Sequence, residues 1–397
     1  MKLLLYSHSF APNVGGVETI VLSLASGLAQ LRTVDNRPKF DLTLVTETPA
    51  RDLDASALPF TVVRRPDTRA LWRLIKAADL IHLAGPALLP LFLAWLARKP
   101  FVLEHHGYQS VCLNGLLLHQ PDQTICPGHF QAARFQKCVR CQAAEMSWLR
   151  SFVQLLLMFP RNILSRSAAC NIAVSQHVSQ RIALPHSQVI YHGVETASRA
   201  EIPVADISLF RGAPLRFAYV GRLVPEKGLP VLLRAARILQ QEKLAFELHL
   251  IGDGPQRANL EAMVQESGLA NCVQFTGILQ GATFAEALSK VHVAVMPSVW
   301  EETAGLAAME HMMRGRLVIA SNIGGLAETI GDAGLTCLPG DAQDLARCMR
   351  TVLQDRSVVA TLGGKARTRA ESLFLRERMI ADHQKLYEQT LGWNTHR

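Results

Sequence analysis

The sequence predicts an α/β protein with two doubly wound units, each a parallel sheet covered by helices on both faces. Short apolar runs alternate with longer segments of helical periodicity along most of the chain, which is typical of parallel strands buried on both sides. This alternation starts again after a poorly periodic stretch at 197–214. A length of 397 residues is enough for two domains of ordinary size.

The first unit is predicted to span residues 1–196, with its first helix at Val17–Leu31 and another near Met146–Ser165. A cysteine-rich insertion at 108–145 interrupts the alternation and is predicted as a long loop without regular structure. The expected strands are Lys2–His8, Phe40–Thr46, Phe60–Arg64, Leu80–Ala84, Phe101–Glu104, Ala169–Val174 and Gln188–Tyr191.

The second unit is predicted to span residues 215–375, after a linker at 197–214, and residues 376–397 are predicted to be helical. Ligands of doubly wound sheets bind beyond the carboxyl ends of the strands. We therefore expect a site in a central cleft between two facing units. The expected strands are Leu215–Val220, Phe246–Ile251, Val273–Thr276, His292–Met296 and Leu317–Ala320.

Composition indicates a globular protein, since 49% of residues are hydrophobic and 19% are charged. The net charge of +8 is uneven: residues 1–195 hold 19 basic against 12 acidic side chains, and the remainder holds 22 against 21. A basic first half suits a membrane surface, a lipid-linked phosphate or nucleic acid, although an ordinary solvated face explains it equally well. Basic stripes interleaved with aromatic residues are missing, so no nucleic-acid partner is expected.

We expect a cytoplasmic protein, because the first residues predict no targeting signal and the cysteines form no dense disulfide pattern. The longest apolar stretches, Pro86–Leu96 and Phe152–Phe159, are too short to span a bilayer. Both are interpreted as core helices. Alternatively, either one lies in a membrane interface with flanking arginines at the headgroups, which would place the protein peripherally on the inner face of the cytoplasmic membrane.

Two glycine loops follow predicted strands and precede helices, where free helix amides can bind an anion. The first loop contains Gly15 and Gly16, and a tight turn is its alternative explanation. The second loop, Gly221–Gly228, presents Arg222 and Lys227. Two cations at the positive end of a helix suit a diphosphate and the charge on a departing nucleotide. A solvated pair of side chains is the alternative.

The segment from Pro297 to Glu310 carries two carboxylates. Glu302 is expected in the loop after a strand, and Glu310 inside an apolar helix that begins at Gly305. A carboxylate among alanines and methionines is costly to bury without hydrogen-bond donors, and sugar hydroxyls can supply them. Glu310 could otherwise be an exposed helix residue. In the first unit, His106 follows a strand on its ligand side and either contacts a sugar or is structural.

Taken together, these segments resemble the family 4, or group 1, retaining glycosyltransferases, which have the GT-B fold of two Rossmann-like domains. Gly221–Gly228 resembles the family's diphosphate loop, Glu302 and Glu310 its paired glutamates, and Ile323–Glu328 the segment that follows. The resemblance implies His106, Glu302, Arg222 and Lys227 as catalytic residues. Gly252 lies in a glycine turn after a strand, which could border a nucleotide or merely turn the chain. We expect a donor site made of Gly15, Gly16, Gly221, Arg222, Lys227, Gly252, Ile278, Ala304, Gly305, Leu306 and Glu310.

Such a protein would transfer a sugar with retention from a nucleotide diphosphate sugar to a lipid-linked or polysaccharide acceptor bound by the first domain. The resemblance implies that catalysis needs no metal cofactor, that the leaving phosphate helps to deprotonate the acceptor, and that the last helix crosses back to the first domain. Uridine diphosphate sugars are favoured, with guanosine diphosphate mannose as the alternative. Thr303-Ala304 replaces the family's usual Pro-Phe, which leaves the sugar open. A GT-B sugar-nucleotide epimerase and a non-catalytic nucleotide-sugar-binding protein are the alternative functions.

Four cysteines lie close together in the insertion: Cys112, Cys126, Cys138 and Cys141. The last two form a C-x-x-C pair, and four thiolates would complete a tetrahedral zinc site. Structural zinc is therefore predicted, with His119 and His129 as substitute ligands. Disulfides, free thiols and an iron–sulfur cluster are the alternatives.

Overall fold

The computed structural model describes residues 1–13, 15–50, 57–196 and 214–392. The chain divides into two compact units. Unit 1 comprises Met1–Gly193 and Arg376–Arg397, and unit 2 comprises Val194–Leu375. Residues 197–213 of the predicted linker lie outside the described residues.

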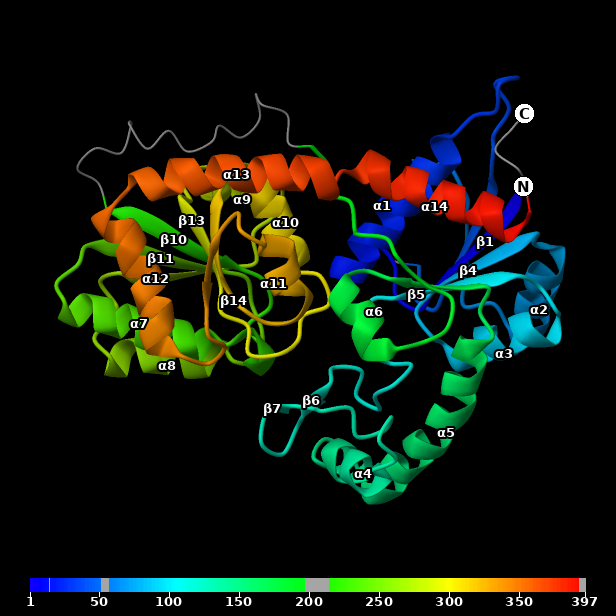
Figure 1. Ribbon diagram of the computed structural model, residues 1–397, viewed down its shortest axis with the longest axis horizontal. Helices are drawn as coiled ribbons and strands as arrows, with labels where there is room; N and C mark the ends of the chain where they lie inside the picture. Colours follow the sequence, from blue (N-terminus) through cyan, green and yellow to red (C-terminus); the bar gives the residue numbers. More distant parts are fainter. Residues whose placement is uncertain (14, 51–56, 197–213, 393–397) are drawn as a thin grey trace. The chain divides into compact units, whose positions relative to one another are not determined.

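Unit 1 contains a parallel sheet of seven strands in the order β3-β2-β1-β4-β5-β8-β9 (Figure 1). The central strands are fully apolar or nearly so and buried on both faces, as predicted. The strands are β1 (Lys2–Ser7), β2 (Asp41–Thr46), β3 (Thr61–Arg64), β4 (Leu80–Ala84), β5 (Phe101–His105), β8 (Cys170–Ala173) and β9 (Ser187–Val189).

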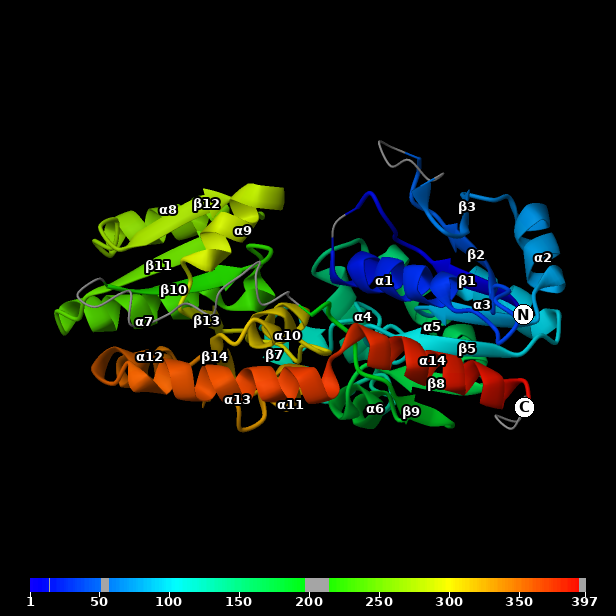
Figure 2. The same ribbon diagram turned by 90° about the horizontal axis from the view of Figure 1, so that it is seen from above.

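The helices of unit 1 include one from the far end of the sequence. α14 (Arg376–Thr390) runs beside α1 (Gly16–Gln30), as Figures 1 and 2 show. Arg376 Nε donates to Ser23 Oγ over 2.9 Å. A Cβ at Gly27 would lie 2.1 Å from Ile380 Cδ1, so this glycine allows the two helices to approach. The other helices are α2 (Thr68–Ala77), α3 (Leu88–Leu96), α5 (Trp148–Arg166) and α6 (Gln176–Ile182).

The cysteine segment is more regular than predicted. It contains a short antiparallel pair, β6 (Leu118–His119) with β7 (Thr124–Ile125), and a helix, α4 (Phe135–Ala143), which packs on α5. The prediction of a loop without regular structure was therefore wrong. Periodicity was a poor guide here because α4 buries only Cys138 and Gln142.

Unit 2 contains a parallel sheet of six strands in the order β12-β11-β10-β13-β14-β15. The strands are β10 (Leu215–Val220), β11 (Phe246–Ile251), β12 (Val273–Gly277), β13 (Val293–Met296), β14 (Leu317–Ser321) and β15 (Leu335–Cys337). The helices are α7 (Leu229–Gln241), α8 (Arg257–Glu266), α9 (Gly281–Ser289), α10 (Leu306–Met313), α11 (Gly324–Ile330), α12 (Ala342–Gln354) and α13 (Ser357–Leu373), with a 3-10 turn, η3, at Pro225–Lys227.

Both sheets reverse their strand order at one point. In unit 1 the reversal lies between β1 and β4, and in unit 2 it lies between β10 and β13. Ligand sites of open α/β sheets lie at the carboxyl ends of the strands that flank such a reversal. The loops after these four strands are therefore where each unit is expected to bind a ligand. No helix in the described part of the chain is both long enough and apolar enough to cross a bilayer.

Candidate active site

In unit 2 the loop Gly221–Gly228 meets the loop that begins at Pro297 and carries Glu302. The two loops follow the neighbouring strands β10 and β13. The backbone N–H of Val299 donates to the Glu226 carbonyl over 3.0 Å. Gly228 has a φ of +68°, and a Cβ there would lie 2.0 Å from the Pro297 carbonyl oxygen. Only glycine combines this backbone conformation with so close an approach. The contact fixes the end of η3, which carries Lys227, against the loop that carries Glu302.

Lys227 and Glu302 form an ion pair, with 2.9 Å between Lys227 Nζ and Glu302 Oε1. Glu302 is only 5% exposed, and the Ser298 hydroxyl donates to the same carboxylate oxygen. The Trp300 ring lies 5.7 Å from Lys227 Nζ and supplies a cation–π contact. Lys227 remains partly accessible, so an incoming phosphate can reach its ammonium group without unfolding the loop.

Arg222 lies in the loop that carries Lys227, and its backbone contacts Tyr219 of β10. The Tyr219 hydroxyl donates to the Arg222 carbonyl over 2.7 Å. Burial, followed by the negative charges of Glu302 and Glu226, raises the pKa of Tyr219, while the Arg222 guanidinium opposes the rise. Arg222 is exposed. The structure thus places Arg222 and Lys227 in the loop after β10 and pairs Lys227 with Glu302.

The helix α10 continues directly from the Glu302 loop and carries the second predicted glutamate. Gly305 precedes α10 in a left-handed conformation, with φ +76°. The Glu302 carbonyl accepts the Gly325 N–H over 2.6 Å, and the Ala304 carbonyl accepts the Thr329 hydroxyl. These bonds hold the loop before α10 against α11. Burial raises the pKa of Glu310 against the opposing charge of Arg314, so this carboxylate needs hydrogen-bond donors to remain ionised.

Gly252 and Ile278, which were also predicted to bind the donor, lie in different surroundings. Gly252 has a φ of +136°, and a Cβ there would lie 2.0 Å from the Gly221 carbonyl oxygen. Gly252 is therefore required for the close approach of the loops after β10 and β11. Ile278 is 69% exposed and follows β12, which lies two strands away from β10 in the sheet. A role of Ile278 in donor binding stays a prediction.

Unit 1 has a cavity of about 1100 Å³ at its own strand reversal. Gly15 and Gly16 stand at the start of α1, whose next residues, Val17 and Glu18, line this cavity. Glu18 accepts from the Ser9 hydroxyl over 2.6 Å. The lining comes from the ends of β1, β4 and β5 and from α3 and α5, and includes Ser7, Ser9, Glu18, Ala84, Leu89, His106, Gln109 and Arg161.

His106 lines this cavity and belongs to a cluster that sequence reasoning missed. Its Nδ1 lies 3.1 Å from His192 Nε2, and its Nε2 lies 3.6 Å from Glu104 Oε2. Glu104 is also 3.0 Å from His82 Nε2. One indication of this cluster was present in the sequence, which is a single polar residue inside an otherwise apolar buried strand, such as His82 in β4. Such a residue requires a partner, but its sequence position does not identify that partner.

All eight cysteines are free thiols. Burial, together with Cys112, Cys126 and Cys141, raises the pKa of Cys138 to about 12, so the four predicted ligands share one neighbourhood. In the described ranges, two groups of three side chains bring possible metal-ligating atoms within 4.8 Å of one another. Both groups consist of histidines around Glu104 and contain no cysteine. Zinc at the cysteines stays a prediction.

Two α/β units, each with a parallel sheet and ligand loops at its strand reversal, are the features of the GT-B fold. Solved structures share this fold. A crystal structure of the Anabaena protein HepE in complex with UDP-glucose matches with a TM-score of 0.70 and 20% identity, over 98% of this chain and 100% of that one. Sucrose-phosphate synthase from Thermosynechococcus elongatus matches with a TM-score of 0.70 and 24% identity, over 98% and 99% of the two chains. The predicted fold class is confirmed.

Residues 214–355 match the family model "Glycosyl transferases group 1", and this part of the chain belongs to that family. A 2-deoxystreptamine glucosyltransferase from Streptomyces kanamyceticus is 38% identical over 150 residues, covering 37% of this chain and 38% of that protein. Sulfoquinovosyl transferase SQD2 from Arabidopsis thaliana is 36% identical over 172 residues, covering 42% and 32%. The match thus spans only about a third of the length of these curated relatives. The family match at residues 214–355 contains Gly221–Gly228, Glu302 and Glu310.

Proposed function

We propose that the protein is a retaining glycosyltransferase that moves a sugar from a uridine diphosphate sugar to a lipid-linked saccharide or a growing polysaccharide. The observation that carries the proposal is the ion pair between Lys227 and the buried carboxylate of Glu302, with the exposed Arg222 in the same loop as Lys227. Two cations and the first amides of α10 are suited to a diphosphate, and a carboxylate accepts hydrogen bonds from sugar hydroxyls.

The donor chemistry follows from this arrangement. In unit 2, Lys227 and Arg222 would hold the diphosphate and stabilise the negative charge that develops on it as the glycosidic bond breaks. Glu302 would then accept from the sugar and Glu310 from the ribose. Same-face attack would let the departing phosphate take the acceptor proton, so no dedicated base is required. HepE was solved in complex with UDP and UDP-glucose, which favours uridine over guanosine diphosphate in the present proposal.

The acceptor is assigned to the cavity of unit 1, where His106 would contact it. Leu88 and Leu89 of α3 line both this cavity and an apolar surface that α3 forms with α5. α3 and α5 pack on each other and share a smaller cavity of about 400 Å³ lined by Leu88, Leu89, Phe92, Pro160 and Leu164. Large apolar side chains on both helices are exposed, including Trp95, Trp148, Phe152 and Ile163. Patches of this kind mark surfaces that bind proteins, ligands or membranes.

We propose that the exposed apolar surface of α3 and α5 binds a membrane that contains anionic lipid. Neither α3 nor α5 contains an acidic residue, while α5 carries Arg150, Arg161 and Arg166. Basic residues beside exposed apolar ones are the composition of a helix that lies in a membrane interface. A lipid-linked acceptor could then reach the cavity from the bilayer surface. Structural zinc at the four cysteines is part of the same proposal, since it would fix the segment that carries α4 against α5.

The donor site is tested by binding and turnover. Wild-type protein is expected to gain thermal stability with UDP and with a UDP-sugar, and less with GDP or GDP-mannose. Lys227→Ala should weaken UDP binding at least tenfold and abolish most transfer, because a charged hydrogen bond to phosphate contributes about 1.5–3 kcal/mol. Glu302→Gln should keep UDP binding and lose transfer.

Two exposed residues provide matched controls, Lys365→Ala on α13 and Glu266→Gln on α8. Both should retain binding and transfer. Anomeric configuration of the product, read by proton NMR, tests retention. Normal transfer by Lys227→Ala and Glu302→Gln, or a GDP preference in the wild type, would contradict the corresponding part of the proposal.

A further inference from the structure

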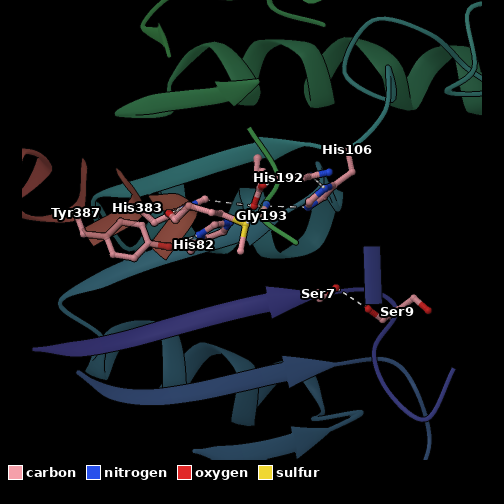
Figure 3. Close-up of polar contacts among 10 residues, drawn as sticks. Ser7, Ser9, His82, His106, His192, Gly193, His383 and Tyr387 are labelled. Carbon is pink, nitrogen blue, oxygen red and sulfur yellow. Dashed lines mark hydrogen bonds and ion pairs between the residues drawn. The ribbon is translucent and has the colours of Figure 1, made fainter. Parts of the chain in front are cut away.

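Four histidines from distant parts of the chain, His82, His106, His192 and His383, lie close together (Figure 3). The carboxylate of Glu104 faces all four. Its Oε2 lies 3.0 Å from His82 Nε2, 3.6 Å from His106 Nε2 and 3.8 Å from His383 Nε2, and its Oε1 lies 3.8 Å from His192 Nε2. His82 and His383 are fully buried and Glu104 is 1% exposed. An ionised carboxylate at this depth is costly unless cations or hydrogen-bond donors surround it.

The hydrogen bond of His383 restricts where its ring proton can be. Its Nδ1 lies 2.8 Å from the Met379 carbonyl oxygen, which can only accept, so Nδ1 carries the proton. In a neutral ring, Nε2 then turns a lone pair toward the Glu104 carboxylate. Two electron-rich atoms that face each other in a buried site require a positive charge between them.

His82 also faces Glu104, but the Tyr387 hydroxyl can donate or accept, so the tautomer of His82 is not fixed as that of His383 is. The Nδ1 of His82 lies 2.5 Å from the Tyr387 hydroxyl, and its Nε2 faces Glu104. Burial acts to raise the pKa of Glu104, but the surrounding histidines, led by His106, outweigh this and hold the pKa well below its ordinary value.

Hydrogen bonding inside the protein leaves the cluster incomplete. The buried atoms Glu104 Oε1 and His383 Nε2 have no hydrogen-bond partner. The possible ligating atoms of His82, Glu104 and His383 all lie within 4.8 Å of one another. From this convergence of two imidazole nitrogens and one carboxylate in a dry site, we propose that His82, Glu104 and His383 bind a divalent transition-metal ion of the zinc class.

The dimensions and surroundings fit such an ion. Zinc bonds of about 2.0–2.1 Å in a tetrahedron separate neighbouring ligand atoms by roughly 3.3 Å. The distances of 3.0 and 3.8 Å from Glu104 Oε2 to the two imidazoles bracket that value. Metal-bound histidines commonly hydrogen-bond a second oxygen through the other ring nitrogen, as His82 does with Tyr387 and His383 with Met379. The metal would join β4, β5 and α14 and would hold Glu104 in place beside His106.

The metal content of the full chain tests the site. Protein made without an affinity tag, incubated with zinc chloride and desalted, is measured by inductively coupled plasma mass spectrometry. We expect His82→Gln and His383→Gln each to hold one zinc per chain less than the wild type. The control His186→Gln, at an exposed position, should match the wild type. Equal metal content in the wild type and His383→Gln would overturn the proposal.

Cobalt(II) separates this site from the cysteines and covers the case in which a histidine variant fails to fold. The double variant Cys138→Ser, Cys141→Ser keeps His82, Glu104 and His383. We expect it to retain one cobalt per chain after desalting, with a visible d–d spectrum and no thiolate charge-transfer band. Absence of retained cobalt in this variant would overturn the proposal and would show that the cluster is held by shared protons. Neither measurement depends on transfer activity.

Discussion

At the scale of single residues, Glu310 shows how an unfavourable side chain indicates a ligand. It is a carboxylate in the apolar helix α10, and burial raises its pKa. The native state therefore binds more protons than the unfolded state above about pH 4.5, and the stability contributed by this group decreases as pH rises. A bound ribose would reverse this effect by donating hydrogen bonds to the ionised form.

Glu310→Gln is accordingly expected to remove part of the loss of stability between pH 4.5 and 7 in the absence of nucleotide. The same variant should bind UDP about tenfold more weakly, because a neutral amide accepts a weaker hydrogen bond from ribose than a carboxylate does. Chemical denaturation across this pH range and calorimetry with UDP measure the two effects. Glu266→Gln, an exposed position on α8, is the control and should change neither. Unchanged UDP affinity in Glu310→Gln would contradict the ribose assignment.

How far single residues could be predicted depended on sequence distance. Arg222, Lys227, Glu302 and Gly305 follow neighbouring strands, so strand order alone brings their loops together. The cluster around Glu104 could not be predicted, because His82 and Tyr387 are 305 positions apart. His82 looked like an isolated polar residue in an apolar strand, and Tyr387 lies in the largely polar helix α14.

At the scale of elements, burial explains which boundaries were predictable. Leu215–Val220 and Phe246–Ile251 were predicted to the residue because central parallel strands are apolar runs between polar loops. α4 was missed because few of its residues face a core. The helices α3 and α5 were interpreted as core elements, with a membrane interface as the alternative. Their many exposed apolar side chains favour the alternative.

This exposed face of α3 and α5 gives a prediction about lipid binding. Trp95→Glu and Phe152→Glu should each lower binding to vesicles of phosphatidylcholine with phosphatidylglycerol at least tenfold, because burial of such a side chain in the interface contributes about 1.5–3 kcal/mol. Val34→Glu, at an exposed apolar residue outside these helices, is the control and should bind as the wild type does. Co-sedimentation at low salt measures the effect. Equal binding by all four proteins would exclude α3 and α5 as the lipid surface.

At the scale of the whole molecule, unit 1 is discontinuous in sequence. α14 follows unit 2 in the chain but buries Met379, Ile380, His383, Leu386 and Tyr387 in unit 1. Lys39 pairs with Glu388 over 2.5 Å, which adds a polar contact to the same helix. Unit 2, by comparison, has its own core and its own ligand loops within one continuous stretch. The integrity of unit 1 should therefore depend on residues that unit 2 does not need.

A chain that ends at residue 375 is expected to lose the folded structure of unit 1 and keep that of unit 2. Removal of one large buried side chain costs about 2–5 kcal/mol, so removal of several exceeds the stability of an ordinary domain. Hydrogen exchange should be fast in β1, β4 and β5 and slow in β10 and β11, and UDP should still stabilise the truncated chain. A control chain that lacks only the last five residues should exchange as the full chain does. Slow exchange in β1 and β4 of the truncated chain would show that α14 is dispensable for unit 1, and loss of the UDP effect would show that unit 2 cannot bind its ligand alone.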